Sequence, residues 1–222
     1  MSAGRTARER ARTELTTEIK DEARRQLATE GAHSLSLRAV ARSLGMVSSA
    51  IYRYFPSRDH LLTALIIDAY DAMGDAAEKA DPGGVPTERW HSVCVAIRRW
   101  ALEHRHEYAL IYGSPVPGHQ TPRDTATPAA RVPTLLIDIA RDARPPEDDL
   151  VPVLAEQARE VLTSISSSVP EYVLTRVMVA WTQLFGMVGF ELSGQFIGGA
   201  DPADPFFDYA VQHMTRFVGL RG

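Results

Sequence analysis

The sequence is poor in the residues on which disulfide-stabilised and secreted proteins depend. It contains one cysteine, Cys94, so a disulfide bond within the chain and a zinc site built from several cysteines are both excluded. It contains no asparagine, which excludes N-linked glycosylation. We therefore expect a protein of a reducing, intracellular environment, with Cys94 as a small buried residue.

Long hydrophobic runs are also missing. The longest strongly apolar stretch lies between Arg176 and Glu191 and holds 14 uncharged residues, whereas a membrane-spanning helix needs about 20. Residues 1–30 are polar and rich in arginine, without the apolar segment of a secretion signal. We expect a buried helix in the apolar stretch and no association with membranes.

Charge is distributed unevenly along the chain. The 24 basic and 28 acidic residues give a net charge of −4, which excludes a uniformly basic nucleic-acid coat. Residues 1–60 hold 11 basic against 7 acidic residues, while the remainder holds 13 against 21. A basic head on an acidic body suits an anion-binding module joined to a domain with another task.

Apolar residues recur at helical spacing, and no stretch alternates with the period of two that strands show, so we predict an all-α protein. An N-terminal helix-turn-helix domain is expected over residues 1–60, a connecting helix over about 59–80 and a second domain over 81–222. Residues 1–10 are expected to form a frayed basic arm. Helices are predicted at about 5–30, 36–44, 48–54, 58–79, 87–105, 106–112, 128–142, 149–165, 170–194 and 204–219.

The most informative segment runs from Ser36 to Leu65. Ser36 is a good N-cap for a short helix that ends at Gly45, and a second short helix follows until Pro56. Two short helices joined through a glycine turn are typical of a helix-turn-helix, whose second helix enters the DNA major groove. We expect Ser36, Tyr54 and Arg58 to hold phosphates. Base edges are assigned to Arg38, Ser48, Ser49 and Tyr52, and Arg53 adds positive charge.

This segment resembles the DNA-binding domain of the TetR family of bacterial transcriptional regulators. The resemblance covers about residues 15–70 and is carried by residues 35–41, 44–45, 51–55, 57–59 and 61–62. One departure is visible, because the family often has Ser or Thr where this chain has Val47. We expect Ser48 to cap the second helix instead.

The resemblance implies a homodimer that binds a palindromic operator in double-stranded DNA and is released by a small-molecule effector. The later sequence is similar to one subgroup of the family at Trp90-His91, at residues 108–118 and at residues 181–186. Aromatic and neighbouring side chains are either ordinary core or the wall of an effector pocket. The candidate effector-binding residues are Trp100, Tyr108, Tyr112, His119, Met178, Trp181 and Phe185.

The last two predicted helices are apolar on more than one face, so each needs a second partner. A homodimer supplies that partner, and its half-sites on DNA lie about one duplex turn, ~34 Å, apart. The predicted interface residues are Val173, Val177, Leu184, Val188, Phe207, Val211 and Met214.

Two rival classes compete with this interpretation, an enzyme and a helix-turn-helix module that binds only protein. The sequence has no Gly-x-Ser-x-Gly elbow, Walker motif or dinucleotide fingerprint, so we expect no enzyme and no cofactor. His104 and His106 are two residues apart and face different directions on a helix, so we expect no metal site. Repression is favoured over activation only through the family resemblance.

Overall fold

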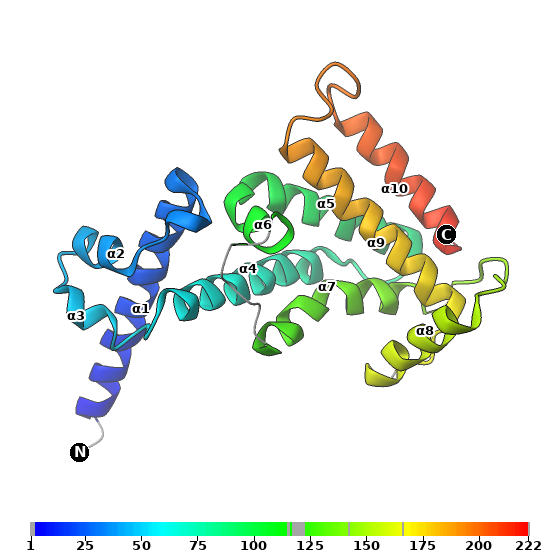
Figure 1. The fold of residues 1–222 in the computed structure, drawn as a ribbon. Helices are drawn as coiled ribbons and strands as arrows, with labels where there is room; N and C mark the ends of the chain where they lie inside the picture. Colours follow the sequence, from blue (N-terminus) through cyan, green and yellow to red (C-terminus); the bar gives the residue numbers. More distant parts are fainter. Residues whose placement is uncertain (1–2, 115, 117–122, 142, 166, 222) are drawn as a thin grey trace. The chain divides into compact units, whose positions relative to one another are not determined.

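The computed structural model describes residues 3–114, 116, 123–141, 143–165 and 167–221. These residues form α-helices and two short 3-10 turns without any strand, as the sequence predicts (Figure 1). The chain divides into two compact units, the first made of residues 1–69 with 106–125 and the second of 70–105 with 126–222. The helices are α1 (Ala3–Glu30), α2 (Leu37–Ser43), α3 (Ser48–Ile51), α4 (Arg58–Ala80), α5 (Pro86–Glu103), α6 (Arg105–Tyr112), α7 (Ala126–Ile139), α8 (Pro152–Ser164), α9 (Glu171–Leu192) and α10 (Asp204–Val218).

The first unit has a core built from one face of each of its first four helices. Residues four apart on α1 face the same side, and Ile19, Ala23 and Leu27 are all buried there. The other helices contribute Leu37, Val40, Ala41, Ile51, Leu61, Leu62 and Leu65, all at most 5% exposed. Burial of these side chains fixes the two short helices, which are too short to be stable alone.

Ion pairs add a polar connection on the outside of this core. Asp68 on α4 accepts hydrogen bonds from Lys20 at 2.8 Å and from Arg24 at 2.6 Å, both on α1. Arg24 also lies 3.2 Å from the carboxylate of Glu107 on α6. Because these side chains are partly buried and share partners, the network ties three helices of the first unit together.

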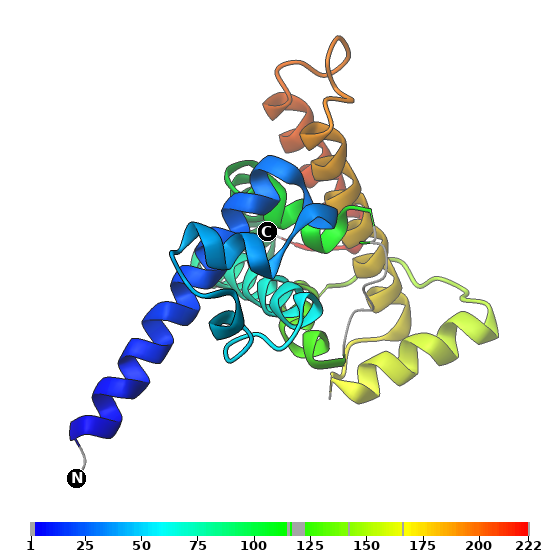
Figure 2. The ribbon, with the colours of Figure 1, turned by 60° about the vertical axis from the view of Figure 1, so that its left-hand side comes forward.

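The predicted frayed arm at residues 1–10 is wrong, because α1 begins at Ala3. Alanine, arginine and glutamate dominate this stretch and have high helix propensity, so the helix continues beyond the core that it packs on. Its first turns extend past α2 and α3, and residues 6–14 are exposed (Figure 2).

The second helix of the helix-turn-helix is shorter than predicted. The α-helical pattern ends at Ile51, and the chain continues to Tyr54 in tighter turns. There the backbone N–H of Arg53 donates to the Ala50 carbonyl, and that of Tyr54 donates to the Ile51 carbonyl. Pro56 restricts the backbone of the residue before it, which favours an early end to the α-helix. Tyr52 therefore lies at the C-cap of α3 rather than inside it.

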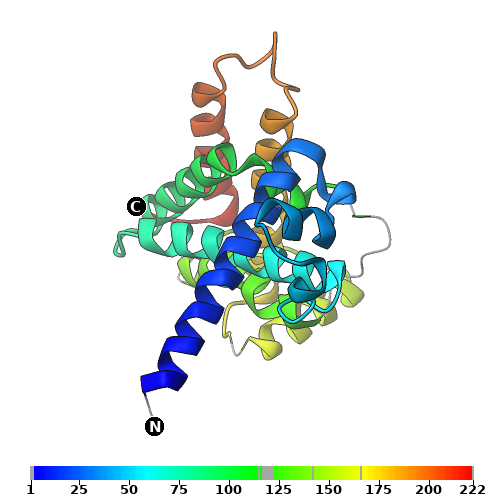
Figure 3. The ribbon, with the colours of Figure 1, turned by 90° about the vertical axis from the view of Figure 1, so that its left-hand side faces the viewer.

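The second unit has its own core, which includes α5, α7, α9 and α10. Trp90, Ile97, Leu136, Leu184 and Phe207 are at most 1% exposed. Helices α9 and α10 lie side by side and are joined by the loop of residues 193–203 (Figure 3). Helix α8 packs on α9 and buries only Ala158 and Leu162 of its own residues.

The predicted bounds in the second unit differ from the observed ones by up to three residues. Helix α8 begins at Pro152 rather than at residue 149, because proline favours the first position of a helix. Helix α7 covers Ala126–Ile139 rather than 128–142. The fold class and the order of the helices are confirmed.

One arginine of α7 holds three acidic residues of α4. Arg131 donates to Asp75 at 2.6 Å, to both carboxylate oxygens of Glu78 at 2.9 and 2.6 Å, and to Asp71. Gly74 leaves the space for it, because a Cβ atom there would lie 2.8 Å from the Arg131 Nε. We call these four charged residues the Arg131 clamp.

Helix α9 is long and apolar enough to cross a membrane by length and composition alone. A core helix passes the same test, and α9 buries eight of its side chains inside the second unit, among them Val173, Leu184 and Val188. This is the buried helix that the sequence predicts.

Candidate nucleic-acid interface

The turn between α2 and α3 is fixed by a glycine and by backbone hydrogen bonds. Gly45 has a φ of 65°, in the left-handed region that glycine adopts without strain. The backbone N–H of Met46 donates to the Ala41 carbonyl at 2.8 Å, and that of Gly45 to Arg42 at 3.1 Å. At the start of α2 the Ser36 hydroxyl accepts from the Ala39 N–H at 3.4 Å, which confirms the predicted N-cap.

The side chains of this motif divide between the core and the solvent. Ile51 and Phe55 point inward and are 0% and 6% exposed. Tyr52 is 43% exposed, so it is available for contact with a ligand. Of the other predicted DNA-binding residues, Arg38, Ser48, Ser49 and Arg53 are exposed, and Ser36, Tyr54 and Arg58 are partly exposed.

Three exposed arginines of the motif have no carboxylate partner among the described residues, a property that they share with exposed arginines elsewhere, such as Arg99 and Arg105. In the part of the chain that the structure describes, Arg38, Arg42 and Arg53 form no ion pair and no side-chain hydrogen bond. By contrast, Arg24, Arg89 and Arg98 each pair with carboxylates. Exposed guanidinium groups without protein partners are the groups that phosphates and guanine edges attract.

Arg58 differs from these three because it is used inside the domain. Its Nε donates to the Leu35 carbonyl at 3.2 Å and its Nη2 to the Ala32 carbonyl at 2.8 Å. These two bonds anchor the segment that leads into α2 to the start of α4. These bonds give Arg58 a role in positioning the motif, and its predicted contact with a DNA phosphate stays a prediction.

Sequence reasoning missed the role of Val47. The N-cap of α3 is Val47, not Ser48 as predicted, and no side-chain hydrogen bond caps the helix. Val47 is 73% exposed. The signal was available in the sequence, because valine replaces the Ser or Thr that a helix N-cap favours.

The predicted effector-binding residues occupy different surroundings. Trp100 is buried and stacks on His104 with 5.2 Å between ring centres, and Phe185 is buried beside Trp181. Tyr108 belongs to the first unit, where burial raises the pKa of its hydroxyl, and it packs against Tyr112. Met178 is 43% exposed. His119 lies outside the described residues.

The indoles of Trp90 and Trp181 share an unusual property. In both, the Nε1 is buried and has no hydrogen-bond partner within the described residues, and of the two only Trp181 is among the predicted effector-binding residues. A buried N–H without an acceptor costs free energy, so such groups normally have a partner.

The predicted interface residues all lie inside the second unit. They are at most 2% exposed, so their side chains are not available to a second chain, and we correct the prediction accordingly. The apolar faces that these residues form do belong to buried helices, as predicted. They are covered by other helices of the same chain rather than by a second chain. The residues concerned are Val173, Val177, Leu184, Val188, Phe207, Val211 and Met214.

A different set of apolar side chains on α9 and α10 is exposed. Val179 and Phe190 on α9 are 48% and 58% exposed, and Phe206, Tyr209 and Phe217 on α10 are between 41% and 60% exposed. Spacings of three, eight and eleven residues place the α10 side chains on one face of the helix. We call these five residues the α9–α10 apolar surface. Large apolar side chains exposed on two neighbouring helices are candidates for a protein–protein contact.

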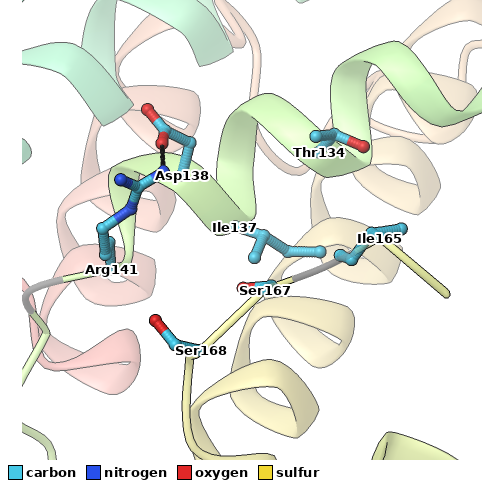
Figure 4. A pocket seen from close by; sticks show the side chains of 7 residues that line it. All are labelled: Thr134, Ile137, Asp138, Arg141, Ile165, Ser167 and Ser168. Carbon is cyan, nitrogen blue, oxygen red and sulfur yellow. Dashed lines mark hydrogen bonds and ion pairs between the residues drawn. The ribbon is translucent and has the colours of Figure 1, made fainter. Parts of the chain in front are cut away.

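Two of the hollows in the second unit lie along α7. One of about 190 Å³ is lined by residues that include Thr134, Asp138 and Arg141, with Asp138 paired to Arg141 (Figure 4). A more open one of about 740 Å³ shares Thr134 and Asp138 and reaches Arg131. None of the predicted effector-binding residues lines either of these two hollows.

Cys94 is placed unfavourably for redox chemistry, and the described acidic and histidine residues form no metal cluster. Cys94 is fully buried, and burial raises the pKa of its thiol far above the usual range. Among the described residues, no three His, Cys, Asp or Glu side chains are grouped so that they could hold a metal ion.

Comparison with known proteins agrees with this architecture. The family profile "Bacterial regulatory proteins, tetR family" matches residues 19–65, and "Tetracyclin repressor-like, C-terminal domain" matches residues 90–214. The chain is 38% identical over 202 residues to the HTH-type transcriptional regulator Rv1816 of Mycobacterium tuberculosis, covering 86% of this chain and 85% of that protein.

Solved structures show the same similarity. The crystal structure of the regulatory protein SCO4313 matches with a TM-score of 0.80 and 34% identity, covering 93% of this chain and 97% of that one. BioQ bound to its double-stranded DNA operator shares the fold, with a TM-score of 0.52 and 16% identity over 92% of this chain and 97% of that one.

A helix-turn-helix unit with an exposed basic face, joined to a helical C-terminal unit, defines a DNA-binding transcriptional regulator. The chain belongs to the TetR family of these regulators, which bind DNA operators.

Proposed function

We propose that the protein is a homodimeric repressor that binds a palindromic operator and leaves it when a small-molecule effector binds. The observation that carries the DNA-binding part is the exposed face of α2 and α3, where Arg38, Arg42 and Arg53 have no partner among the described residues and Tyr52 is open to solvent. In this proposal α3 enters the major groove and the protein works in the cytoplasm, on the nucleoid when bound.

Individual roles follow from exposure and chemistry. Arg38, Ser48, Ser49 and Tyr52 face base edges, where arginine makes its commonest specific contact with guanine. Arg53, Ser36 and Tyr54 face phosphates, which position the protein without sequence preference.

The test begins by selecting duplexes from a random library and measuring affinity for the selected sequence at several salt concentrations. Arg53→Ala is expected to weaken binding to all duplexes and to lower the salt slope by about 1 for each phosphate that the arginine neutralises. Arg38→Ala is expected to cost about 1–3 kcal/mol at the preferred sequence and to relax the preference at one position.

Arg159→Ala is the matched control, because Arg159 is an exposed arginine of α8 that pairs with Glu156 and Glu171. This variant should bind DNA like the parent. A wild-type protein that retains no duplex at low salt contradicts the proposal and favours the rival class, a module that binds only protein.

The proposed dimer uses the α9–α10 apolar surface. Gly186 lies on the exposed side of α9 with nothing within 4 Å of the position of a Cβ atom, so a second helix can approach closely there. Family membership supports the same arrangement.

Gly186→Arg tests the dimer, because a monomer tolerates the side chain and a close helix contact does not. Sedimentation is expected to show a dimer for the wild type and a monomer for this variant. The control Val153→Arg changes a valine on α8 that is 65% exposed, and it should remain dimeric. A monomeric wild type at micromolar concentration contradicts the proposal.

For the effector, the buried and unpartnered N–H of Trp181 supports a ligand with a hydrogen-bond acceptor. A compound that raises the melting temperature and lowers operator affinity identifies the effector. Trp181→Phe is expected to weaken its binding, whereas Thr134→Trp, which fills the hollows along α7, should leave binding unchanged (Figure 4). If Thr134→Trp weakens binding and Trp181→Phe does not, the effector binds at the hollows along α7 instead. A compound that stabilises the protein without changing its operator affinity contradicts release by the effector.

A further inference from the structure

Val47 is exposed at a position where valine serves neither the helix nor the core. It occupies the N-cap of α3 without a side-chain hydrogen bond to the helix. Its side chain is 73% exposed, while Ile51 and Phe55 fill the inward positions of the same segment. Serine at this position would cap the helix and valine does not, so helix stability does not explain the residue.

The surroundings of Val47 are those of the DNA-facing surface. Ser48 and Ser49 follow it, both exposed, and Tyr52 lies one turn further on. The small hydroxyl side chains of the two serines let the backbone of α3 approach base edges. Serine hydroxyls donate and accept, so they discriminate weakly between bases.

The major-groove edge of each base pair is polar except for one group, the 5-methyl of thymine. An aliphatic side chain that loses its hydration in the major groove can therefore pack against one apolar group, the thymine methyl. We propose that Val47 is a specificity-determining residue that packs its two methyl groups against a thymine methyl in each half-site of the operator. This inference rests on the proposed docking of α3 in the major groove.

The experiment removes single methyl groups from the DNA. Deoxyuridine replaces thymidine at one symmetric pair of positions at a time in the selected duplex, which deletes the 5-methyl and leaves base pairing intact. For the wild type we expect one pair of positions at which affinity falls about fourfold per half-site, the value of one buried methyl group. Other positions should change little.

Val47→Ser should abolish this discrimination and bind the thymidine and deoxyuridine duplexes equally. Val47→Ala keeps one methyl group and should retain part of it. Thermal unfolding checks that the variants are folded. Because serine is a better N-cap than valine, Val47→Ser should melt at a temperature no lower than that of the wild type.

A matched control exists in the second unit. Val151 is also a valine at a helix N-cap without a side-chain hydrogen bond, in this case of α8, and is 60% exposed. Val151→Ser repeats the chemical change away from α3, and the fourfold loss on deoxyuridine substitution should persist in it.

Two outcomes overturn the inference while leaving the proposed function intact. In the first, the wild type binds the selected duplex but no position is sensitive to deoxyuridine. In the second, Val47→Ser keeps the full sensitivity, which assigns the methyl contact to another residue such as Tyr52. A wild type that binds no duplex is a separate result, because it overturns the proposed function before any deoxyuridine probe is used.

Discussion

Arginines of similar appearance in the sequence perform different tasks once the chain is folded. Arg53 is exposed, and Arg58, five residues later, donates to two backbone carbonyls. Composition and spacing predict a DNA contact for both arginines, and neither reveals the two backbone carbonyls that Arg58 also binds. Ser36, by contrast, was predictable as a cap, since capping is a local interaction.

Arg58→Ala is expected to destabilise the first unit by about 1.5–3 kcal/mol, because two carbonyls lose a charged hydrogen-bond donor. Arg58→Lys should recover little of this, since a single ammonium group does not reproduce the two-pronged guanidinium geometry. Chemical denaturation measures the loss. Arg53→Ala should leave stability within about 0.5 kcal/mol of the wild type, and equal destabilisation by both variants contradicts the assignment.

Cys94 should be unreactive in the folded protein. Its thiol is buried on α5 and its pKa is raised by burial, so almost no thiolate is present or accessible at neutral pH. Ellman's reagent is expected to detect no thiol in the native protein and one after unfolding, in keeping with the single cysteine. Rapid modification of the native protein would mean that α5 opens readily.

At the scale of elements, helix ends with a local signal were predicted closely and those without one were not. Gly31 and Gly45, both with positive φ, follow the ends of α1 and α2 as the sequence indicated. The end of α3 was misplaced, because apolar periodicity continues through Phe55 while the backbone already turns more tightly. A turn of this kind keeps the inward spacing of side chains, so the pattern alone does not reveal it.

The start of α5 depends on a carboxylate in the linker before it. Two nitrogens of Arg89 donate to Asp81 at 2.9 and 2.7 Å, which lowers the pKa of that carboxyl group, with help from the Gly83 N–H. Because the folded pKa lies below the unfolded value of about 3.9, the pair stabilises the protein above that pH. The stabilisation is lost as pH falls through the folded pKa.

Asp81→Asn is therefore expected to cost about 1–3 kcal/mol at pH 7 and progressively less below about pH 4. Urea denaturation of both proteins between pH 7 and pH 3 measures the difference. A difference that stays constant over this range, or grows towards low pH, contradicts the role given to the ion pair.

The end of α10 requires glycine. Gly219 has a φ of 81°, and a Cβ atom there would lie 2.4 Å from the backbone nitrogen of Pro145. Gly219→Ala is expected to cost about 1–3 kcal/mol through strain and this clash.

Gly198→Ala is the matched control for this substitution. Gly198 has a φ of 78° with nothing within 4 Å of the position that a Cβ atom would take, so only the backbone strain of about 1 kcal/mol should be measured. Thermal unfolding compares the two variants, and equal costs would exclude a contribution from Pro145.

At the scale of the whole molecule, the sequence predicted the fold class and the helix-turn-helix but assigned the wrong side chains to the dimer. The face of α9 that carries Val177 and Leu184 is apolar because helices of the same chain cover it. Periodicity shows that a face is buried, and it does not show which neighbour buries it. The exposed α9–α10 apolar surface became visible only when those neighbours were in place.

If the protein is a dimer through this surface, its melting temperature should rise with protein concentration, because association stabilises the folded state by mass action. Calorimetry over a hundredfold concentration range measures the effect. Gly186→Arg should melt at a temperature independent of concentration. A wild type whose melting temperature is equally independent of concentration contradicts a dimer that dissociates as it unfolds.

The Arg131 clamp has a mechanical consequence. Its three carboxylates, on Asp71, Asp75 and Glu78, are spaced along two turns of α4, so one guanidinium resists both sliding and rotation of α7 against that helix. All four charged residues of the Arg131 clamp belong to the second unit. A force applied to α7 is therefore carried into the C-terminal half of α4 through three carboxylates rather than through one.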